Sequence, residues 1–455
     1  MKHLHLLYTF FFGVAVLLFF GLAYPHHLHY QEQYQLFLFD STYVWEIVRQ
    51  PGGVADLLGR FCTQFFLFAW VGALIIGILL SVVQLLTLRL ANWGWFYGLS
   101  FVPSFLLWLF LLDENALLGS VWAVLLTLLA VWGVTLLPKG WIRRIVMVVA
   151  IPVLYWVVGP SWSGSHYYRY PTVFPALFYA AWLSAVVLPL IIRGCHKWVT
   201  LRRPLVSLCS FVLVFIVMGM FVWKNSNFKA EKVMRYDFMA CHQQWNRILA
   251  TVNTEKPNNQ IGVTVQNLAL AMHGQLADHL FEYNQNGILG LLPDVKSDAT
   301  SPMPTAEAFY QLGMINVAQR TVFEAQEAIL DFQKSGRCYK RLAQTNLING
   351  SYEVACKYLM ALQKTLFYRE WANETLSLLG NEQAIAKHPE YGRLRQFNYD
   401  EDFYFSDHTT PEMLENLYFS NTDNRLAYEY LKAYYMLTGD RDSYTKLLLH
   451  TSTKQ

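Results

Sequence analysis

The sequence predicts an all-α protein with two parts, a seven-helix transmembrane bundle followed by an extramembrane α-helical repeat solenoid. Two observations lead to this prediction: seven apolar stretches fill the first 225 residues, and the polar remainder has a helical period. Hydrophobic residues make up 54% of the 455 residues and charged residues only 15%, whereas a soluble domain carries about 25% charged residues. This composition excludes intrinsic disorder and a disulfide scaffold, and it argues against a soluble globular enzyme.

The first part consists of the predicted spans. A helix needs about 20 predominantly apolar residues to cross a bilayer, and seven stretches qualify: Leu4–Tyr24, Cys62–Leu88, Trp93–Leu112, Leu117–Leu137, Ile142–Val158, Val173–Ile192 and Leu205–Trp223. The first has the position of a signal peptide. It is long, has no small-residue cleavage site and precedes six more spans, so we expect a retained helix.

The distribution of basic residues predicts how the chain is oriented in the membrane. Residues 1–225 hold 13 Lys/Arg and 6 Asp/Glu, and the remaining residues hold 22 and 26. With the N-terminus in the cytoplasm, nine of the 13 basic residues fall on the cytoplasmic side and four on the outer side, which is the bias of the positive-inside rule. Seven spans then place the second part outside. We therefore expect a multi-pass protein of a bacterial inner membrane, with a transmembrane domain at 1–224 and a periplasmic domain at 225–455.

Two outer loops carry the candidate functional residues. The first, 25–61, contains too many apolar residues for a solvated loop, which predicts two short helices lying on the membrane surface with their aromatic residues at headgroup depth. Pro51-Gly52-Gly53 breaks the chain before the second span. The second loop, 159–172, combines glycine and serine with groups that stack and donate hydrogen bonds: Trp162, His166, Tyr167, Tyr168, Arg169 and Tyr170.

The second part contains a repeated pattern. Segments that begin at Leu312-Gly313, Leu342-Ala343 and Leu431-Lys432 share a large apolar residue, a small residue on a second helix and, in two of them, a turn glycine. This pattern resembles the tetratricopeptide repeat (TPR), and residues 341–364 match it best. A helical array without true repeats is the alternative. Segments 291–305 and 387–411 are expected to be loops.

Several motifs of catalysis and metal binding are absent. The chain has no Gly-rich phosphate loop, HExxH, CxxC or nucleophile-elbow serine. His26, His27 and His29 follow a span and could ligate a metal with Glu32, but interface histidines with solvated tips are the favoured interpretation. Cys338 and Cys356 either pair or remain buried thiols, and we favour thiols.

The membrane half resembles glycosyltransferases of the GT-C fold, which use lipid-phosphate-linked sugars. The resemblance lies in the number of spans, the long acidic first outer loop and the polar outer domain. It implies that Glu32 and Asp40 are catalytic carboxylates, and in one helix these two residues would share a face. It also implies substrate contacts from Arg169, His166, Tyr168, Trp162 and Trp45, and no cofactor beyond a divalent cation held by carboxylates. The paired acidic motif of that family, with two acids spaced by one residue, is missing here, and Asp40 could instead cap a helix.

The whole chain also resembles a family of uncharacterised inner-membrane proteins of Bacteroidota, through Glu32-Gln33-Tyr34-Gln35-Leu36-Phe37, the later Pro51-Gly52-Gly53 and the repeat domain. This resemblance supports the architecture and implies no activity.

Two functions follow from these features. The first is envelope glycan transfer from a polyprenyl-phosphate-linked sugar by a glycosyltransferase or oligosaccharyltransferase. The second is a membrane-anchored scaffold or assembly factor whose repeats bind a protein or peptide. A transporter is less favoured because no charged residue falls in the middle of a predicted span. Nucleic-acid binding is excluded by an acidic outer domain.

Overall fold

The computed structural model describes residues 2–159, 176–194, 204–294, 302–329, 333–399 and 409–452. These residues form helices and connecting turns, with no strand among them, which confirms the all-α prediction. They divide into two compact units. The first comprises residues 1–231 with Gln333, and the second comprises 232–329 with 334–455. Helix α11 (Phe228–Cys241) begins in the first unit and continues into the second.

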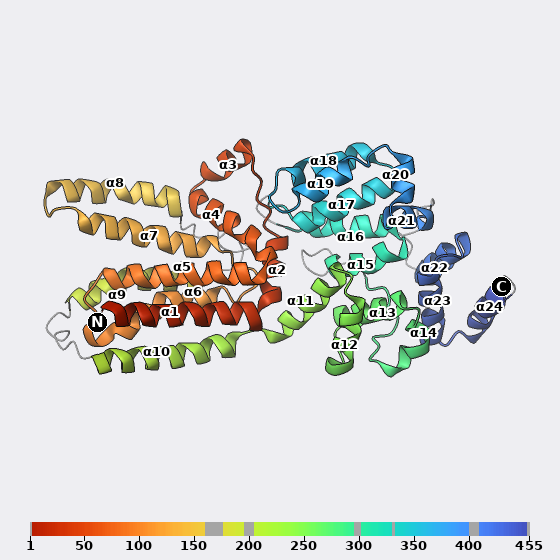
Figure 1. Cartoon of the computed structure of the whole chain (residues 1–455), viewed down its shortest axis with the longest axis horizontal. Coiled ribbons are helices and arrows are strands. Elements are labelled where there is room, and N and C mark those ends of the chain that lie inside the picture. Colours follow the sequence, from red (N-terminus) through yellow and green to blue (C-terminus); the bar gives the residue numbers. More distant parts are fainter. Residues whose placement is uncertain are drawn as a thin grey trace. The chain divides into compact units, whose positions relative to one another are not determined.

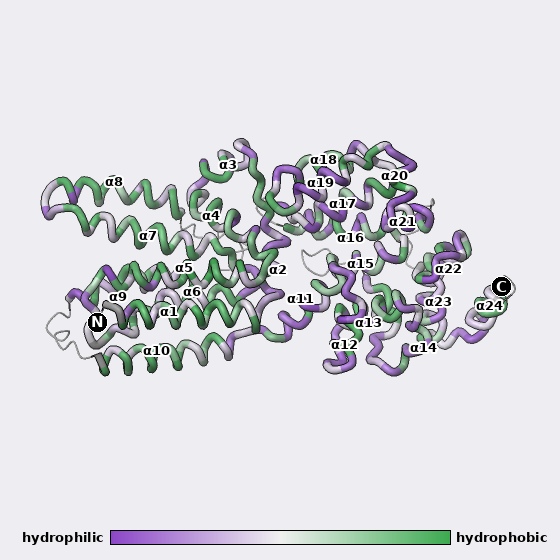
Figure 2. Tube along the Cα trace, viewed as in Figure 1, coloured by the Kyte–Doolittle hydropathy of each residue, from purple (hydrophilic) through white to green (hydrophobic). Residues whose placement is uncertain are grey.

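The first unit is built from long apolar helices (Figures 1 and 2). Six of those described are long and apolar enough to cross a membrane, as expected of a multi-pass membrane protein. Helix α1 reaches this length because a π-helical turn, Phe19–Ala23, continues it. The six helices are α1 (Lys2–Leu18), α5 (Ala69–Arg89), α7 (Gly119–Leu136), α8 (Trp141–Val158), α9 (Ala176–Gly194) and α10 (Pro204–Asn225).

Two predicted spans differ from the structure. The span predicted at Cys62–Leu88 begins only at Ala69, because a 3₁₀ turn (Gln64–Leu67) and an extended Phe68 (φ −109°, ψ 99°) interrupt the helix. The span predicted at Trp93–Leu112 is a shorter element. It consists of the 3₁₀ helix η3 (Gly94–Phe101) and α6 (Val102–Phe110), with non-helical backbone at Phe96.

Helix contacts establish the directions of the chain in this unit. Helices α1 and α5 are antiparallel. Thr9, in the first half of α1, donates a hydrogen bond to Gln84 near the end of α5, whereas Gly21, at the other end of the first span, lies against Trp70 at the start of α5. The short α6 runs parallel to α1: Phe12 and Phe105 have ring centroids 5.1 Å apart, and a second ring pair, Phe19–Trp108, lies 5.4 Å apart farther along. The segment from η3 to α6 therefore passes through the unit alongside the long helices.

A small polar cluster lies buried among these helices. The Thr9 hydroxyl donates to Gln84 Oε1 at 2.7 Å, and Gln84 Nε2 donates to Ser100 Oγ at 3.0 Å. The Ser100 hydroxyl in turn donates to the Tyr97 carbonyl. All three side chains are neutral and have partners, so this cluster fixes helix packing without placing a charge inside the bundle.

The second unit is a series of shorter helices. They are α12 (Trp245–Glu255), α13 (Gln260–Met272), α14 (Leu276–His279), α15 (Pro302–Leu312), α16 (Ile315–Glu327), α17 (Gly336–Ile348), α18 (Tyr352–Gln363), α19 (Arg369–Leu376), α20 (Glu382–Lys387), α21 (Tyr391–Phe397), α22 (Thr409–Ser420), α23 (Arg425–Thr438) and α24 (Arg441–Ser452). Successive pairs pack together, and one core joins residues from α13 to α24.

Three helical hairpins coincide with the predicted repeats. Glycines connect α15 to α16, α17 to α18 and α23 to α24, and each has a left-handed backbone: Gly313 (φ 92°), Gly350 (φ 76°) and Gly439 (φ 73°). The register predicted for the first copy is wrong. Gly313 occupies the turn, whereas the prediction aligned it with Ala343, which lies inside α17. Helix α21 also forms within a segment expected to be a loop, because Tyr391 and Leu394 join the core.

The cysteines in the described ranges are thiols. Cys338 is fully buried with its sulfur 3.4 Å from that of Met303, and Cys356 is partly buried. The structure therefore contains no bond between Cys338 and Cys356, in agreement with the favoured interpretation of the sequence.

Candidate functional site

The loop 25–61, which was predicted to lie on the outer side, folds into three helices rather than the two predicted. They are α2 (Pro25–Gln33), α3 (Ser41–Val48) and α4 (Gly53–Thr63). Proline starts α2 because its missing N–H is not needed in the first turn. The predicted break at Pro51-Gly52-Gly53 is confirmed: Gly52 has φ 84°, precedes α4, and its N–H donates to the Trp156 carbonyl of α8 at 2.8 Å.

The two predicted catalytic carboxylates lie in different surroundings. Asp40 caps α3, and its Oδ1 accepts hydrogen bonds from the N–H groups of Thr42 and Tyr43 at 3.0 and 3.2 Å. Glu32 lies near the end of α2 and is buried, with 6% of its surface exposed. Residues 35–40 between them are not helical. The prediction that Glu32 and Asp40 share a face of one helix is therefore wrong.

The predicted substrate-binding residues are only partly described. Trp45 lies on α3, a helix with no buried residue, and 66% of its surface is exposed. An exposed tryptophan on an amphipathic helix is typical of a membrane interface. Trp162, His166, Tyr168 and Arg169 lie outside the described residues.

Buried polar residues gather along α2, α4 and the chain between and after them. We call this set the polar layer, and it comprises His26, His27, Gln31, Glu32, Gln35, Asp56, Arg60, Thr63 and Gln64. Two members bond carbonyls of the connection between α6 and α7. Gln31 Nε2 donates to the Ala116 carbonyl at 2.7 Å, and His27 Nε2 lies 2.9 Å from the Leu111 carbonyl. Burial lowers the pKa of His27 to about 4, so this imidazole is neutral at pH 7.

A carboxylate from α11 holds the beginning of α2. Glu231 accepts the N–H of His26 at 2.8 Å through Oε1 and the N–H of His27 at 2.9 Å through Oε2. These are two of the amides that a helix N-terminus leaves without an internal acceptor, and the helix dipole favours a negative charge there. Nearby, the Tyr24 hydroxyl accepts the Asn227 N–H at 2.6 Å. Glu231 thereby fixes the position of α2.

The polar layer contains one buried ion pair, Asp56–Arg60. Arg60 donates to Asp56 Oδ2 from Nε at 2.9 Å, and Arg60 Nη2 lies 2.8 Å from the same oxygen. The Arg60 side chain is only 10% exposed and the Asp56 side chain only 5%. Asp56 Oδ1 is buried, and no group in the described ranges donates a hydrogen bond to it. A buried carboxylate oxygen without a donor is costly, and native structures rarely keep one without a reason.

Tyr43 of α3 completes this group. Its hydroxyl donates to the Leu36 carbonyl at 2.9 Å, and it lies close enough to Arg60 for the two groups to interact electrostatically. Burial raises the pKa of Tyr43, although the charge of Arg60 counteracts part of this effect. Burial opposes the charge of Arg60, but Asp56 and Tyr43 together raise the pKa of the guanidinium, so Arg60 remains charged.

A close helix contact positions the pair. Gly59 lies one residue before Arg60, and a Cβ at Gly59 would stand 2.4 Å from the Gly119 nitrogen of α7. Only glycine allows this approach, which presses α4 against α7 and removes Asp56 and Arg60 from solvent. The sequence analysis missed both residues. The signal that could have found them is their i, i+4 spacing, which allows an ion pair on one helix face.

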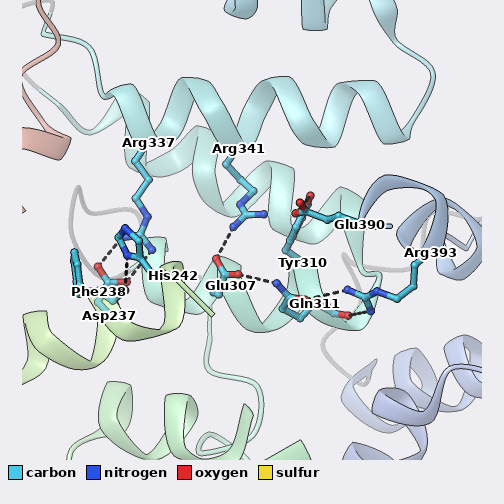
Figure 3. A network of polar contacts seen from close by, with 10 residues as sticks. All are labelled: Asp237, Phe238, His242, Glu307, Tyr310, Gln311, Arg337, Arg341, Glu390 and Arg393. Carbon is cyan, nitrogen blue, oxygen red and sulfur yellow. Dashed lines mark hydrogen bonds and ion pairs between the residues drawn. The ribbon is translucent and has the colours of Figure 1, made fainter. Parts of the chain in front are cut away.

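A second group of buried charges lies in the second unit (Figure 3). Arg337 of α17 donates two hydrogen bonds to the Asp237 carboxylate of α11, at 2.5 and 2.8 Å. One helical turn later, Arg341 pairs with Glu307 of α15 at 2.5 Å. The Arg341 guanidinium also lies 3.6 Å from the centre of the Tyr310 ring.

This network continues from α15 to α21. The Tyr310 hydroxyl donates to Glu390 at 2.8 Å, and burial raises the pKa of this tyrosine well above its usual value. Gln311 donates to Glu307 and accepts from Arg393. The network contains as many carboxylates as guanidinium groups: Asp237, Glu307 and Glu390 against Arg337, Arg341 and Arg393. We interpret it as a charge-balanced structural network that holds these helices together.

Metal binding finds little support in the structure. No three His, Cys, Asp or Glu side chains within the described ranges lie close enough together to hold a metal ion. This applies to His26, His27, His29 and Glu32, the cluster considered from the sequence.

Comparison with known proteins gives the family. The model of a family of unknown function, DUF6057, matches residues 1–163 and 160–455. The chain belongs to the DUF6057 family. No curated protein and no solved structure matches it. The matched ranges include both units, so the unit with the long apolar helices and the unit with the shorter helices both belong to the family's architecture.

Proposed function

We propose that this DUF6057 protein is a membrane transferase that moves a glycan from a polyprenyl-phosphate-linked donor, as GT-C enzymes do. The observation that carries the proposal is the buried Asp56 Oδ1, which has no hydrogen-bond donor among the residues that the structure describes. A hydroxyl of a bound acceptor would supply that donor. The other residues of the polar layer add hydrogen-bonding groups in a unit that is otherwise strongly apolar.

The proposed chemistry is a displacement at the anomeric carbon. An acceptor hydroxyl oxygen attacks this carbon, the bond from the carbon to the phosphate oxygen breaks, and polyprenyl phosphate leaves. The acceptor proton passes to a carboxylate acting as general base. Asp56 takes this role in the proposal, with Glu32 as the second carboxylate of the polar layer, and Arg60 orients Asp56 through two contacts to Oδ2. Asp40 is assigned to helix capping because Oδ1 already accepts two backbone amides.

The proposed topology has seven spans. The eight residues of η3 rise about 2.0 Å each and the nine of α6 about 1.5 Å each. Together they extend roughly 30 Å, about the thickness of the bilayer hydrocarbon. Counting this segment, the N-terminus lies in the cytoplasm of a bacterial inner membrane. The polar layer and the second unit then lie in the periplasm, where GT-C enzymes receive their lipid-linked donors.

A genetic experiment tests this function. The gene is deleted in its host, and lipid-linked saccharides are compared in cells that carry the wild type, Glu32→Gln, Asp40→Asn or Asp56→Asn. We expect the deletion, Asp56→Asn and Glu32→Gln to accumulate an unused donor, while Asp40→Asn accumulates little. Unchanged lipid-linked saccharides in the deletion strain would overturn the proposal.

A non-enzymatic scaffold is the second candidate. It is favoured by the three glycine-connected hairpins, which we propose form a TPR-like array, since such arrays usually bind peptides or helices. Exposed apolar side chains on them, Phe323, Val354 and Met360 at 49%, 39% and 54%, could contact a partner. For the scaffold, truncation after Lys224 should reproduce the deletion phenotype, whereas the carboxylate variants should behave as wild type.

A further inference from the structure

The second unit has an open cavity where α11 turns into α12, opposite the end of α13. Its volume is about 390 Å³, which lies within the range of about 300–1,000 Å³ for small-molecule sites. Six residues line it: Gln243, Gln244, Trp245, Asn246, Arg247 and His273. Neither the polar layer nor the charged network of Figure 3 contributes to it.

The side chains of this cavity share one kind of chemistry. Five of the six carry flat polar head groups: three carboxamides, one guanidinium and one imidazole. A carboxamide can donate and accept at the same time, as a sugar hydroxyl does. No carboxylate lines the cavity, and Arg247 is its one permanently charged residue. The lining therefore suits a neutral ligand with many hydroxyl groups better than a strongly charged one.

Trp245 supplies the apolar part of the site. It is half-buried, packs against the core around Ile248 and also lines the cavity. An aromatic surface with an anchored ring offers a large apolar contact area at little entropic cost. The carbon-bound hydrogens on one face of a sugar ring need such a surface. A peptide would need further apolar pockets, and this cavity has only the tryptophan.

The backbone holds these groups in place. Gln243 has a left-handed backbone (φ 53°), which is uncommon for a residue other than glycine. The turn is fixed by the Gln243 N–H donating to the Ala240 carbonyl at 2.9 Å and the Gln244 N–H donating to the Met239 carbonyl at 2.9 Å. Arg247 Nη1 donates to Gln244 Oε1 at 3.2 Å. The backbone of the turn and the Arg247–Gln244 pair are thus held before a ligand arrives, which reduces the entropy lost on binding.

We propose that this cavity binds one or two units of a neutral saccharide, with the ring against Trp245 and its hydroxyls on Gln243, Gln244, Asn246, Arg247 and His273. The proposal rests on the proposed glycan-transfer function and deepens it, because it assigns a glycan-binding site to the second unit.

Binding measurements on the full-length protein in lipid nanodiscs test the proposal. The probes are the neutral tetrasaccharides chitotetraose, cellotetraose and mannotetraose, with tetragalacturonate and inorganic phosphate as charged comparisons. Isothermal titration is performed on the wild type, Asn246→Ala, Arg247→Ala and Trp245→Phe, which retains an aromatic ring in the core. Arg441→Ala is the matched control, because Arg441 is an exposed arginine on α24, away from the cavity.

We expect saturable binding of at least one neutral tetrasaccharide. Asn246→Ala and Arg247→Ala should each weaken it at least tenfold, and Arg441→Ala should leave it unchanged. The proposal is overturned if no neutral saccharide binds, if phosphate or tetragalacturonate binds more tightly, or if Asn246→Ala and Arg247→Ala bind as the wild type does. Its failure is separable from failure of the proposed function, since the latter is measured by lipid-linked saccharides in Asp56→Asn and Glu32→Gln cells.

Discussion

Breaking the Asp56–Arg60 pair separates its contribution to stability from its contribution to catalysis. Asp56→Asn keeps the shape of the side chain but leaves the charge of Arg60 unpaired in a site where the arginine side chain is only 10% exposed. Removing one partner of a buried ion pair costs about 3–5 kcal/mol. For a unit of this size each kcal/mol shifts the unfolding midpoint by about 2–4 °C. We therefore expect Asp56→Asn to lower the midpoint by about 6–20 °C.

The double variant Asp56→Asn/Arg60→Gln removes both charges and leaves two amides that can bond each other. We expect it to recover more than half of the lost midpoint, because no unpaired charge remains in the buried site. The assay is thermal unfolding of the full-length protein in nanodiscs at one fixed scan rate, since membrane proteins commonly unfold irreversibly. The same variants are scored for lipid-linked saccharides in cells.

The two readouts should diverge. With Asp56 acting on the substrate, the double variant is stable but still accumulates the donor. If it restores both stability and glycan transfer, the pair is structural and the catalytic assignment is wrong. If it is as unstable as Asp56→Asn alone, the reasoning from charge balance is wrong.

Three further predictions concern the same unit. Glu231→Ala should expose the His26 and His27 amides, speed their hydrogen exchange and lower the free energy of unfolding by about 1–2 kcal/mol. Glu231→Gln keeps one acceptor and should lose less, and equal exchange in the wild type and both variants would contradict the capping role. The pKa of His27 is about 4 in the folded protein and about 6.5 in the unfolded chain. The stability that neutral His27 contributes is therefore fully present above pH 6.5 and falls toward pH 4, with a loss of about 2 kcal/mol between pH 7 and 5. Thermal unfolding of His27→Gln should lack this part of the loss. Gly59→Ala should prevent stable expression because its Cβ would meet the Gly119 backbone. Gly133→Ala is the control: open space surrounds this position on α7, so the change should be neutral or slightly stabilising, and equal yields of the two folded variants would contradict the close contact.

Hydropathy predicted the long helices well because a span must satisfy its own backbone in an apolar medium. It could not locate their ends inside the protein. Phe68 is apolar, so nothing in the composition marks the extended backbone that delays α5 until Ala69. Phe96 is also apolar and lies in a predominantly apolar stretch, and the helix that follows it is shorter than predicted.

The repeats show a similar limit. Gly350 and Gly439 were predicted as turns and have left-handed backbones. Gly313 was assigned to a helix because a small residue fits both a helix contact and a turn. Its φ of 92° shows that it is a turn, which shifts the first copy of the pattern.

The sequence and the structure direct attention to the same loop but to different residues as the proposed site. The acidic first outer loop directed attention to Glu32 and Asp40, and the sequence also offered the capping role that Asp40 has in the structure. Asp56 and Arg60 were not predicted because their burial depends on the contact of Gly59 with Gly119, residues 60 positions apart. The i, i+4 spacing of Asp56 and Arg60 allows an ion pair, but the long-range contact that buries the pair leaves no local pattern in a single sequence.

The most direct measurement of the central proposal is transfer by the purified protein. Full-length wild type is reconstituted in liposomes made from the lipids of the deletion strain, which contain the accumulated donor, together with cell-envelope acceptor. The account predicts that the wild type consumes the lipid-linked saccharide and releases polyprenyl phosphate, and that the stable Asp56→Asn/Arg60→Gln variant does not. Equal consumption by both proteins, or by neither, would contradict it.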